Sequence, residues 1–108
     1  MGPRPYRPLP ELEHAVERGD LRMAIAIAKD LASERGRPIG LDLALKLLPL
    51  AAARRELYDA WALRWLTRWV AESPGATIEQ AAEVAAALAD LPVEPHGALA
   101  AVQRASAP

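Results

Sequence analysis

His14 has the residue types and spacing of a metal ligand, because Glu11 and Glu17 stand three residues away on either side. In a helix all three side chains would share one face. Glu-x-x-His is half of a carboxylate-bridged di-metal site, but the other half is missing, since His96 has no such partner. We therefore expect a solvated helix surface around His14, with no metal and no cofactor.

Nucleophilic catalysis would need a serine or threonine beside a histidine. Ser33 falls in the middle of a predicted helix, Ser73 ends another, and Ser106 lies near the end of the chain. The sequence contains no nucleophile elbow, phosphate loop or dinucleotide fingerprint. It also contains no cysteine, which excludes disulfides, thiol catalysis, zinc fingers and iron–sulfur clusters. We predict that the protein is not an enzyme and keep a small cofactor-free enzyme as a third alternative.

The three tryptophans form the most distinctive pattern in the sequence. Trp61, Trp65 and Trp69 recur every four residues and would line one face of a helix. The first interpretation is that they are core residues that replace the absent phenylalanines. The second is that one or two of them line an exposed groove for a partner, since tryptophan is enriched at binding hot spots.

Arg64 and Arg68 lie one turn apart beside this stripe. They could form a solvated polar face, or stack on the indoles and receive an acidic partner or nucleic acid phosphates. We predict a contact surface made of Arg64, Arg68 and whichever of Trp61 and Trp69 stays exposed. DNA binding or transcription regulation is the runner-up function, because the last two predicted helices could imitate a helix-turn-helix but carry few base-reading side chains.

The composition is that of a globular protein. Of the 108 residues, 52% are hydrophobic and 25% are charged, with a net charge of −1, which lacks the basic excess of a typical nucleic-acid binder. No apolar run is long enough to span a membrane, and no signal sequence is apparent. We expect a soluble cytoplasmic protein, and the preference for arginine over lysine and the many alanines suggest a bacterial source.

The first half of the chain predicts three helices. The first starts near Pro10, the second has Asp20 as its N-cap and stops at Gly36, and the third spans Leu41–Arg55 with a kink or break at Pro49. The alternation at Met23–Ala28 would also fit a strand, but the cap and the alanine content favour the helix.

The second half predicts a fourth helix from Leu57 or Asp59 to Glu72, with Asp59 as N-cap and Tyr58 packed on Leu63. The fifth begins with a capping box, in which Thr77 bonds the amide of Gln80 and the Gln80 side chain reaches back, and it runs to Leu91. A short sixth helix spans Pro95–Arg104. The many alanines of the fifth helix could pack against a large neighbour or form a flat face for self-association.

These elements predict an all-α fold, either a five- or six-helix orthogonal bundle or a short stack of antiparallel helical hairpins. We expect a proline-rich flexible tail at residues 1–8, a single helical domain at 9–105 and a short tail at 106–108. The predicted core consists of Leu12, Val16, Leu21, Ile25, Ala28, Leu43, Leu47, Leu50, Trp61, Trp65, Val70, Val84 and Leu88.

The segment Gly19–Ile25 resembles the turn and second helix of a tetratricopeptide repeat, with Gly-Asp at the turn and the small Ala24 placed to face a partner helix. Residues Thr77–Pro92 resemble a second such helix. The resemblance implies protein or peptide binding. The predicted function is therefore a non-enzymatic protein–protein interaction module, an adaptor or regulatory subunit. Its partner would be another protein or peptide, or a second copy in a homo-oligomer, rather than nucleic acid or a membrane.

Overall fold

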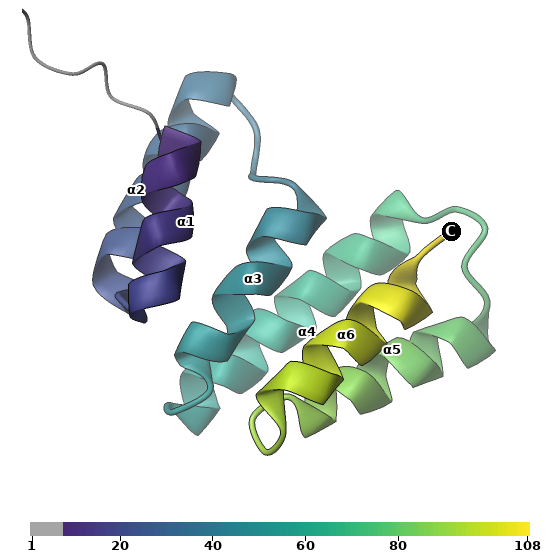
Figure 1. The fold of residues 1–108 in the computed structure, drawn as a ribbon. Helices are drawn as coiled ribbons and strands as arrows, with labels where there is room; N and C mark the ends of the chain where they lie inside the picture. Colours follow the sequence, from purple (N-terminus) through teal and green to yellow (C-terminus); the bar gives the residue numbers. More distant parts are fainter. Residues whose placement is uncertain (1–7) are drawn as a thin grey trace, which may run out of the picture. The chain divides into compact units, whose positions relative to one another are not determined.

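The computed structural model describes residues 8–108 and confirms the all-α fold class. This part of the chain forms six α-helices and contains no strand (Figure 1). Of the predicted tail at residues 1–8, only Pro8 is described, and it begins the first helix; the remaining seven residues lie outside the described part. None of the described helices is both long and apolar enough to cross a membrane. The chain divides into two compact units, one ending at Gly40 and the other spanning Leu41–Pro108. The single domain over residues 9–105 stays a prediction.

The first unit contains a helical hairpin. Helix α1 spans Pro8–Arg18 and starts two residues before the predicted Pro10, and α2 spans Leu21–Arg35 and packs against it. Asp20 caps α2 as predicted, accepting a hydrogen bond from the Met23 amide at 3.0 Å. Gly36 ends α2 with φ of 64°, in the left-handed region that favours glycine.

The buried face of α2 differs from the predicted one. Ala24, Ile27 and Leu31 are buried, whereas Ile25 is only half-buried. Ile25 and Ile27 are two positions apart in the sequence, which places them about 200° apart around the helix, so only one can lie at the centre of the buried face. Leu12 on α1 is buried as predicted; the other predicted core residues of this unit are half-buried: Val16, Leu21 and Ala28.

The second unit contains four helices. They are α3 (Leu41–Ala51), α4 (Arg55–Glu72), α5 (Ile78–Asp90) and α6 (Pro95–Ser106). Helix α3 packs against α4, α5 packs against α6, and α4 touches α5, so the unit consists of two adjoining hairpins (Figure 1).

The boundary between α3 and α4 lies earlier than predicted. Pro49 lies inside α3, which continues for two residues and ends at Ala51 instead of Arg55. The Arg54 amide donates to the Ala51 carbonyl at 2.9 Å and closes the turn without a glycine. Helix α4 can therefore begin at Arg55, one turn before the predicted cap.

The prediction that Asp59 is the N-cap of the fourth helix was wrong. It lies one turn inside α4, where it forms an ion pair with Arg55 at 3.4 Å. The cap position is Arg54, which makes no side-chain capping bond. The predicted cap staple of Tyr58 on Leu63 was wrong for the same reason, because Tyr58 lies inside α4 and not before its N-cap.

The structure confirms one of the two hydrogen bonds predicted for the capping box of α5 and contradicts the other. The Thr77 hydroxyl accepts from the Gln80 amide at 3.1 Å, as predicted. The Gln80 side chain does not reach back; its Nε2 donates to the carbonyls of Ala105 at 3.0 Å and Ala107 at 3.1 Å. Carbonyls at the end of a helix have no amide partner within that helix. The carbonyls at the end of α6 therefore accept the side-chain amide of Gln80, which does not complete the capping box.

The core of the second unit lies between its two hairpins. Among the predicted core residues, Leu47, Trp65, Val84 and Leu88 are buried. The prediction of Val70 as a core residue was wrong, because Val70 is 48% exposed. It directly follows the buried Trp69 and therefore points about 100° away from it around the helix. Leu43, Leu50 and Trp61 are half-buried. The buried cluster of this unit consists of Leu45, Leu48, Ala51, Tyr58, Ala62, Trp65, Trp69, Val84, Ala87, Leu88, Leu91, Ala98 and Val102.

Candidate functional site

Two of the three tryptophans are core residues. Trp65 is 4% exposed and its indole Nε1 donates to the Leu41 carbonyl at 2.9 Å. Trp69 is 3% exposed and its Nε1 donates to the Ser106 carbonyl at 3.1 Å. Each indole therefore has an apolar body in the core and a satisfied polar tip, which is the usual state of a buried tryptophan.

The predicted contact residues do not all come together. Trp61, Arg64 and Arg68 follow one another at spacings of three and four on one flank of α4, but Trp69 lies apart in the core. Trp61 is half-buried against the core cluster and Arg64 is exposed. Arg68 forms an ion pair with Glu72 at 2.8 Å. A contact surface at Trp61, Arg64 and Arg68 stays a prediction.

A second apolar stripe, which the sequence analysis missed, runs along the other flank of α4. Leu63, Leu66 and Val70 recur at spacings of three and four residues. A similar stripe runs along α5, where Ile78, Ala82, Ala85 and Ala89 recur at spacings of four, three and four. This is the periodicity of residues that share one helix face. The sequence contains this signal, but the tryptophan stripe on the same helix has larger apolar side chains and indicates a different apolar face.

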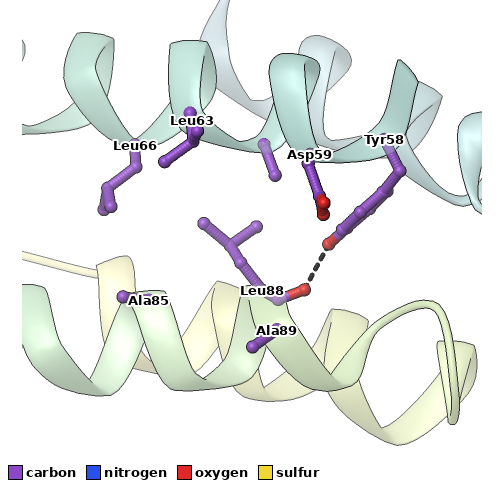
Figure 2. Close-up of a pocket in the computed structure, with 8 residues that line it drawn as sticks. Tyr58, Asp59, Leu63, Leu66, Ala85, Leu88 and Ala89 are labelled. Carbon is purple, nitrogen blue, oxygen red and sulfur yellow. Dashed lines mark hydrogen bonds between the residues drawn. The ribbon is translucent and has the colours of Figure 1, made fainter. Parts of the chain in front are cut away.

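Four residues of these stripes line a groove between α4 and α5, which we call the α4–α5 groove: Leu63, Leu66, Ala85 and Ala89. The other residues of the two stripes lie further along the helices, outside its lining: Val70, Ile78 and Ala82. Figure 2 shows Leu63 and Leu66 directed from α4 toward α5, with Ala85 and Ala89 opposite. The groove has a volume of about 260 Å³, and alanine side chains form most of its α5 wall. Its lining is apolar apart from Tyr58 and Asp59, which lie together near one end.

Tyr58 closes that end of the groove. Its hydroxyl donates a hydrogen bond to the Leu88 carbonyl (Figure 2), and the side chain is 2% exposed. Burial is the main cause that raises the pKa of Tyr58 to about 12; Asp59 adds to this rise and Arg55 opposes it. The phenol therefore stays protonated at neutral pH and serves as a hydrogen-bond donor between two helices.

The surroundings of the groove carry an uneven charge. All the charged residues of α5 are acidic: Glu79, Glu83 and Asp90. On α4, Arg64 directly follows the groove residue Leu63 and is exposed. The groove therefore combines an apolar floor with acidic side chains along α5, the Asp59 carboxylate at one end, and a basic group on α4.

A second cavity, of about 480 Å³, lies where the start of α3, the end of α4 and the end of the chain meet. Four of its lining side chains are engaged within the protein: Glu72 with Arg68, Gln80 with two carbonyls, and the indoles of Trp65 and Trp69 with one carbonyl each. Asp42, Ser73 and Ser106 also line this cavity.

Neither histidine is among the residues that line the two cavities. Glu11, His14 and Glu17 are exposed on α1, and His96 is exposed in the first turn of α6. Within residues 8–108, no three or more histidine or carboxylate side chains converge in a way that could hold a metal ion.

The fold and the groove together define an all-α protein with an apolar groove open to solvent. Comparison of the chain with models of known families, with curated proteins and with solved structures gave no match.

Proposed function

We propose that this chain is a non-enzymatic protein–protein interaction module and that its contact surface is the α4–α5 groove. The observation that carries the proposal is the exposure of large apolar side chains in and beside the groove. Leu63 lines the groove and is 64% exposed, and the stripes continue along the two helices with Val70 at 48% and Ile78 at 80%. A contiguous exposed apolar surface marks an interaction site. Covering each such side chain contributes roughly 1.5–3 kcal/mol when burial is complete.

The chemistry of the groove supports binding over catalysis. Its only polar side chains are Tyr58, which is held as a neutral donor to a carbonyl, and Asp59, which is paired with Arg55. Neither is aimed at the centre of an enclosed site. The acidic charges of α5 would repel DNA phosphates, which favours a protein partner over the DNA-binding alternative.

Two sequence features support the same proposal. The likeness of Gly19–Ile25 to a tetratricopeptide repeat implies protein or peptide binding. The absence of cysteine fits a reducing compartment, so we place this interaction in the cytoplasm. Of the flank that consists of Trp61, Arg64 and Arg68, Arg64 directly follows the exposed groove residue Leu63 and would lie on the rim of the contact.

The test compares two exposed apolar residues of matched accessibility. Ile78 is 80% exposed at the start of α5, on the helix face that also carries the groove residues Ala85 and Ala89, and Val93 is 82% exposed in the turn before α6. A protein retained by the immobilised chain from an extract of the source cell is purified, and its affinity is measured by calorimetry for the wild type, Ile78→Glu and Val93→Glu. We expect Ile78→Glu to weaken binding at least about tenfold and Val93→Glu to leave it unchanged.

Circular dichroism confirms that both variants are folded before their affinities are compared. Equal binding by the two variants would remove the groove as the contact surface. The absence of any binding partner, including a second copy of the chain, would contradict the proposed function itself.

A further inference from the structure

We propose that the occupant of the α4–α5 groove is an amphipathic helix of another protein, with basic side chains flanking its apolar face. The inference rests on the proposed function and names the chemistry of its partner. It follows from the shape of the groove, from the carboxylates around it, and from the lack of ion pairs that would neutralise most of them within residues 8–108.

The groove is shaped for side chains of a third helix. Its volume of about 260 Å³ lies below the roughly 300–1,000 Å³ of typical small-molecule sites. Ala85 and Ala89 leave space along its α5 wall that larger side chains of a partner can fill. A helix presents such anchors at spacings of three and four residues and needs no backbone hydrogen bonds from the groove, whereas an extended peptide needs a sheet edge.

The apolar surface continues beyond the groove at one end. Leu66 lies opposite Ala85, and Tyr58 closes the groove at the other end, where it reaches the later residues of α5 (Figure 2). Past Leu66 and Ala85 the two stripes continue with the exposed Val70 on α4 and Ile78 on α5. A partner helix that extends in this direction therefore covers further apolar side chains.

The α4 stripe becomes acidic at the end that Tyr58 closes. Asp59 and Glu56 precede Leu63 at spacings of four and seven residues, on the same side of the helix. Asp59 lines the groove and pairs with Arg55 at 3.4 Å. Within the described part of the chain Glu56 forms no ion pair, so this end of the groove has an excess of negative charge.

Carboxylates also border the groove along α5. Glu83 and Asp90 directly follow the stripe residues Ala82 and Ala89, so each lies about 100° round the helix from the stripe. Both are exposed, and neither forms an ion pair within residues 8–108. Lysine and arginine have long apolar stems, so basic side chains of a helix that lies over the stripe can reach both carboxylates.

This distribution of charge selects the partner. A helix with basic side chains on the flank that lies over α5 is attracted, and one with acidic side chains there is repelled. Arg64 lies on the α4 side, so we expect the opposite flank of the partner helix to be neutral or acidic. The lining spans about two and a half turns of α4 and one of α5, which makes the contact small and transient.

The test uses three synthetic peptides of about 18 residues as probes of the full chain. The basic peptide has leucines at spacings of three and four and lysines flanking them, the acidic peptide has glutamate in place of each lysine, and the scrambled peptide has the composition of the basic one with its leucines spread around the helix. Fluorescence anisotropy measures their affinities. We expect the basic peptide to bind with a dissociation constant of roughly 10–100 µM and the other two to bind at least about tenfold more weakly.

Charge reversal beside the groove should invert this preference. The variant Glu83→Lys/Asp90→Lys should bind the basic peptide at least about tenfold more weakly than the wild type does, and should prefer the acidic peptide. Asp30→Lys/Glu34→Lys, at exposed positions of α2, changes the net charge by the same amount and is the matched control. It should keep the wild-type preference. Circular dichroism confirms that both variants are folded.

Three results would overturn the inference: a wild type that binds the basic peptide no better than the acidic or the scrambled one, a wild type that binds none of them at about 1 mM, and a charge reversal that leaves the preference unchanged. The purified partner of the calorimetric test then separates the inference from the proposed function. Weaker binding of that partner by Ile78→Glu, with no effect of Glu83→Lys/Asp90→Lys, means that the groove binds a protein of different chemistry. Equal binding by Ile78→Glu and Val93→Glu removes the groove as the contact surface and contradicts both.

Discussion

The hydroxyl of Tyr58 donates a hydrogen bond to the backbone carbonyl of Leu88 and joins α4 to α5 across 30 residues of sequence. The same Leu88 carbonyl accepts the amide of Leu91 at the end of α5. Tyr58 thus fixes one end of the α4–α5 groove to the point where α5 stops. The width of the groove at that end depends on a side chain whose body is in the core and whose polar tip is satisfied by the backbone.

This bond makes the stability of the second unit sensitive to alkaline pH. The folded-state pKa of Tyr58 is raised to about 12, whereas an unfolded tyrosine titrates near pH 10. Between these values the unfolded state releases a proton that the folded state retains, so stability is full below about pH 10 and falls as the pH rises toward 12. The loss attributable to Tyr58 should reach about 2–3 kcal/mol.

The measurement is the free energy of unfolding by urea at several pH values, for the wild type and Tyr58→Phe. At neutral pH the variant should lose about 1 kcal/mol, since the Leu88 carbonyl keeps its bond from Leu91. It should also lack the tyrosine part of the decline above pH 10. Parallel pH curves for the two proteins would contradict the raised pKa.

The tryptophans should differ in their access to solvent. Trp65 and Trp69 are nearly inaccessible, whereas Trp61 is half-buried. Acrylamide should therefore quench one part of the fluorescence, and Trp61→Phe should remove most of that part. Trp69→Phe, the matched change in the core, should leave the quenchable part in place. An equal effect of the two substitutions would contradict the placement of Trp69.

Gln80→Glu should weaken the contact between α5 and the end of α6. The change replaces the amide that donates to Ala105 and Ala107 with a carboxylate facing the same carbonyls. Two lost hydrogen bonds amount to about 2 kcal/mol, and a negative charge near the start of α5 returns about 0.3–1 kcal/mol through the helix dipole. We expect a net loss of about 1–2 kcal/mol in urea unfolding, with faster amide exchange in the last turn of α6. Gln103→Glu, an exposed position on α6, is the control for the added charge and should change stability little.

Pro49→Ala should stabilise α3. Proline at this position lacks an amide hydrogen and crowds the Leu45 carbonyl, yet α3 continues past it to Ala51. Alanine would supply the missing hydrogen bond and raise the free energy of unfolding by about 1–2 kcal/mol, less than the full effect in a helix centre because the helix ends two residues later. Pro92→Ala, beyond the end of α5, is the control. Destabilisation by Pro49→Ala would indicate that the proline is needed to direct the chain into the turn before α4.

The sequence by itself determined the fold class and most of the helix ends. Asp20, Gly36, Thr77 and Pro95 act on amides or carbonyls within a few residues of themselves, so their effects can be inferred without knowledge of the rest of the chain. The boundary before α4 could not be inferred in this way, because backbone hydrogen bonds close the turn at Arg54 with no glycine or proline in it.

Only the tertiary structure decided which side of α4 is buried. The helix carries two apolar stripes, one of tryptophans and one with Leu63, Leu66 and Val70, and a helix can turn only one of them fully into a core. The choice depends on partners far along the chain: the carbonyls of Leu41, Leu88 and Ser106 accept the polar tips of Trp65, Tyr58 and Trp69. A buried donor needs an acceptor, and the positions of those acceptors exist only once the helices have packed. The leucine stripe was left at the surface for that reason, and with it the groove.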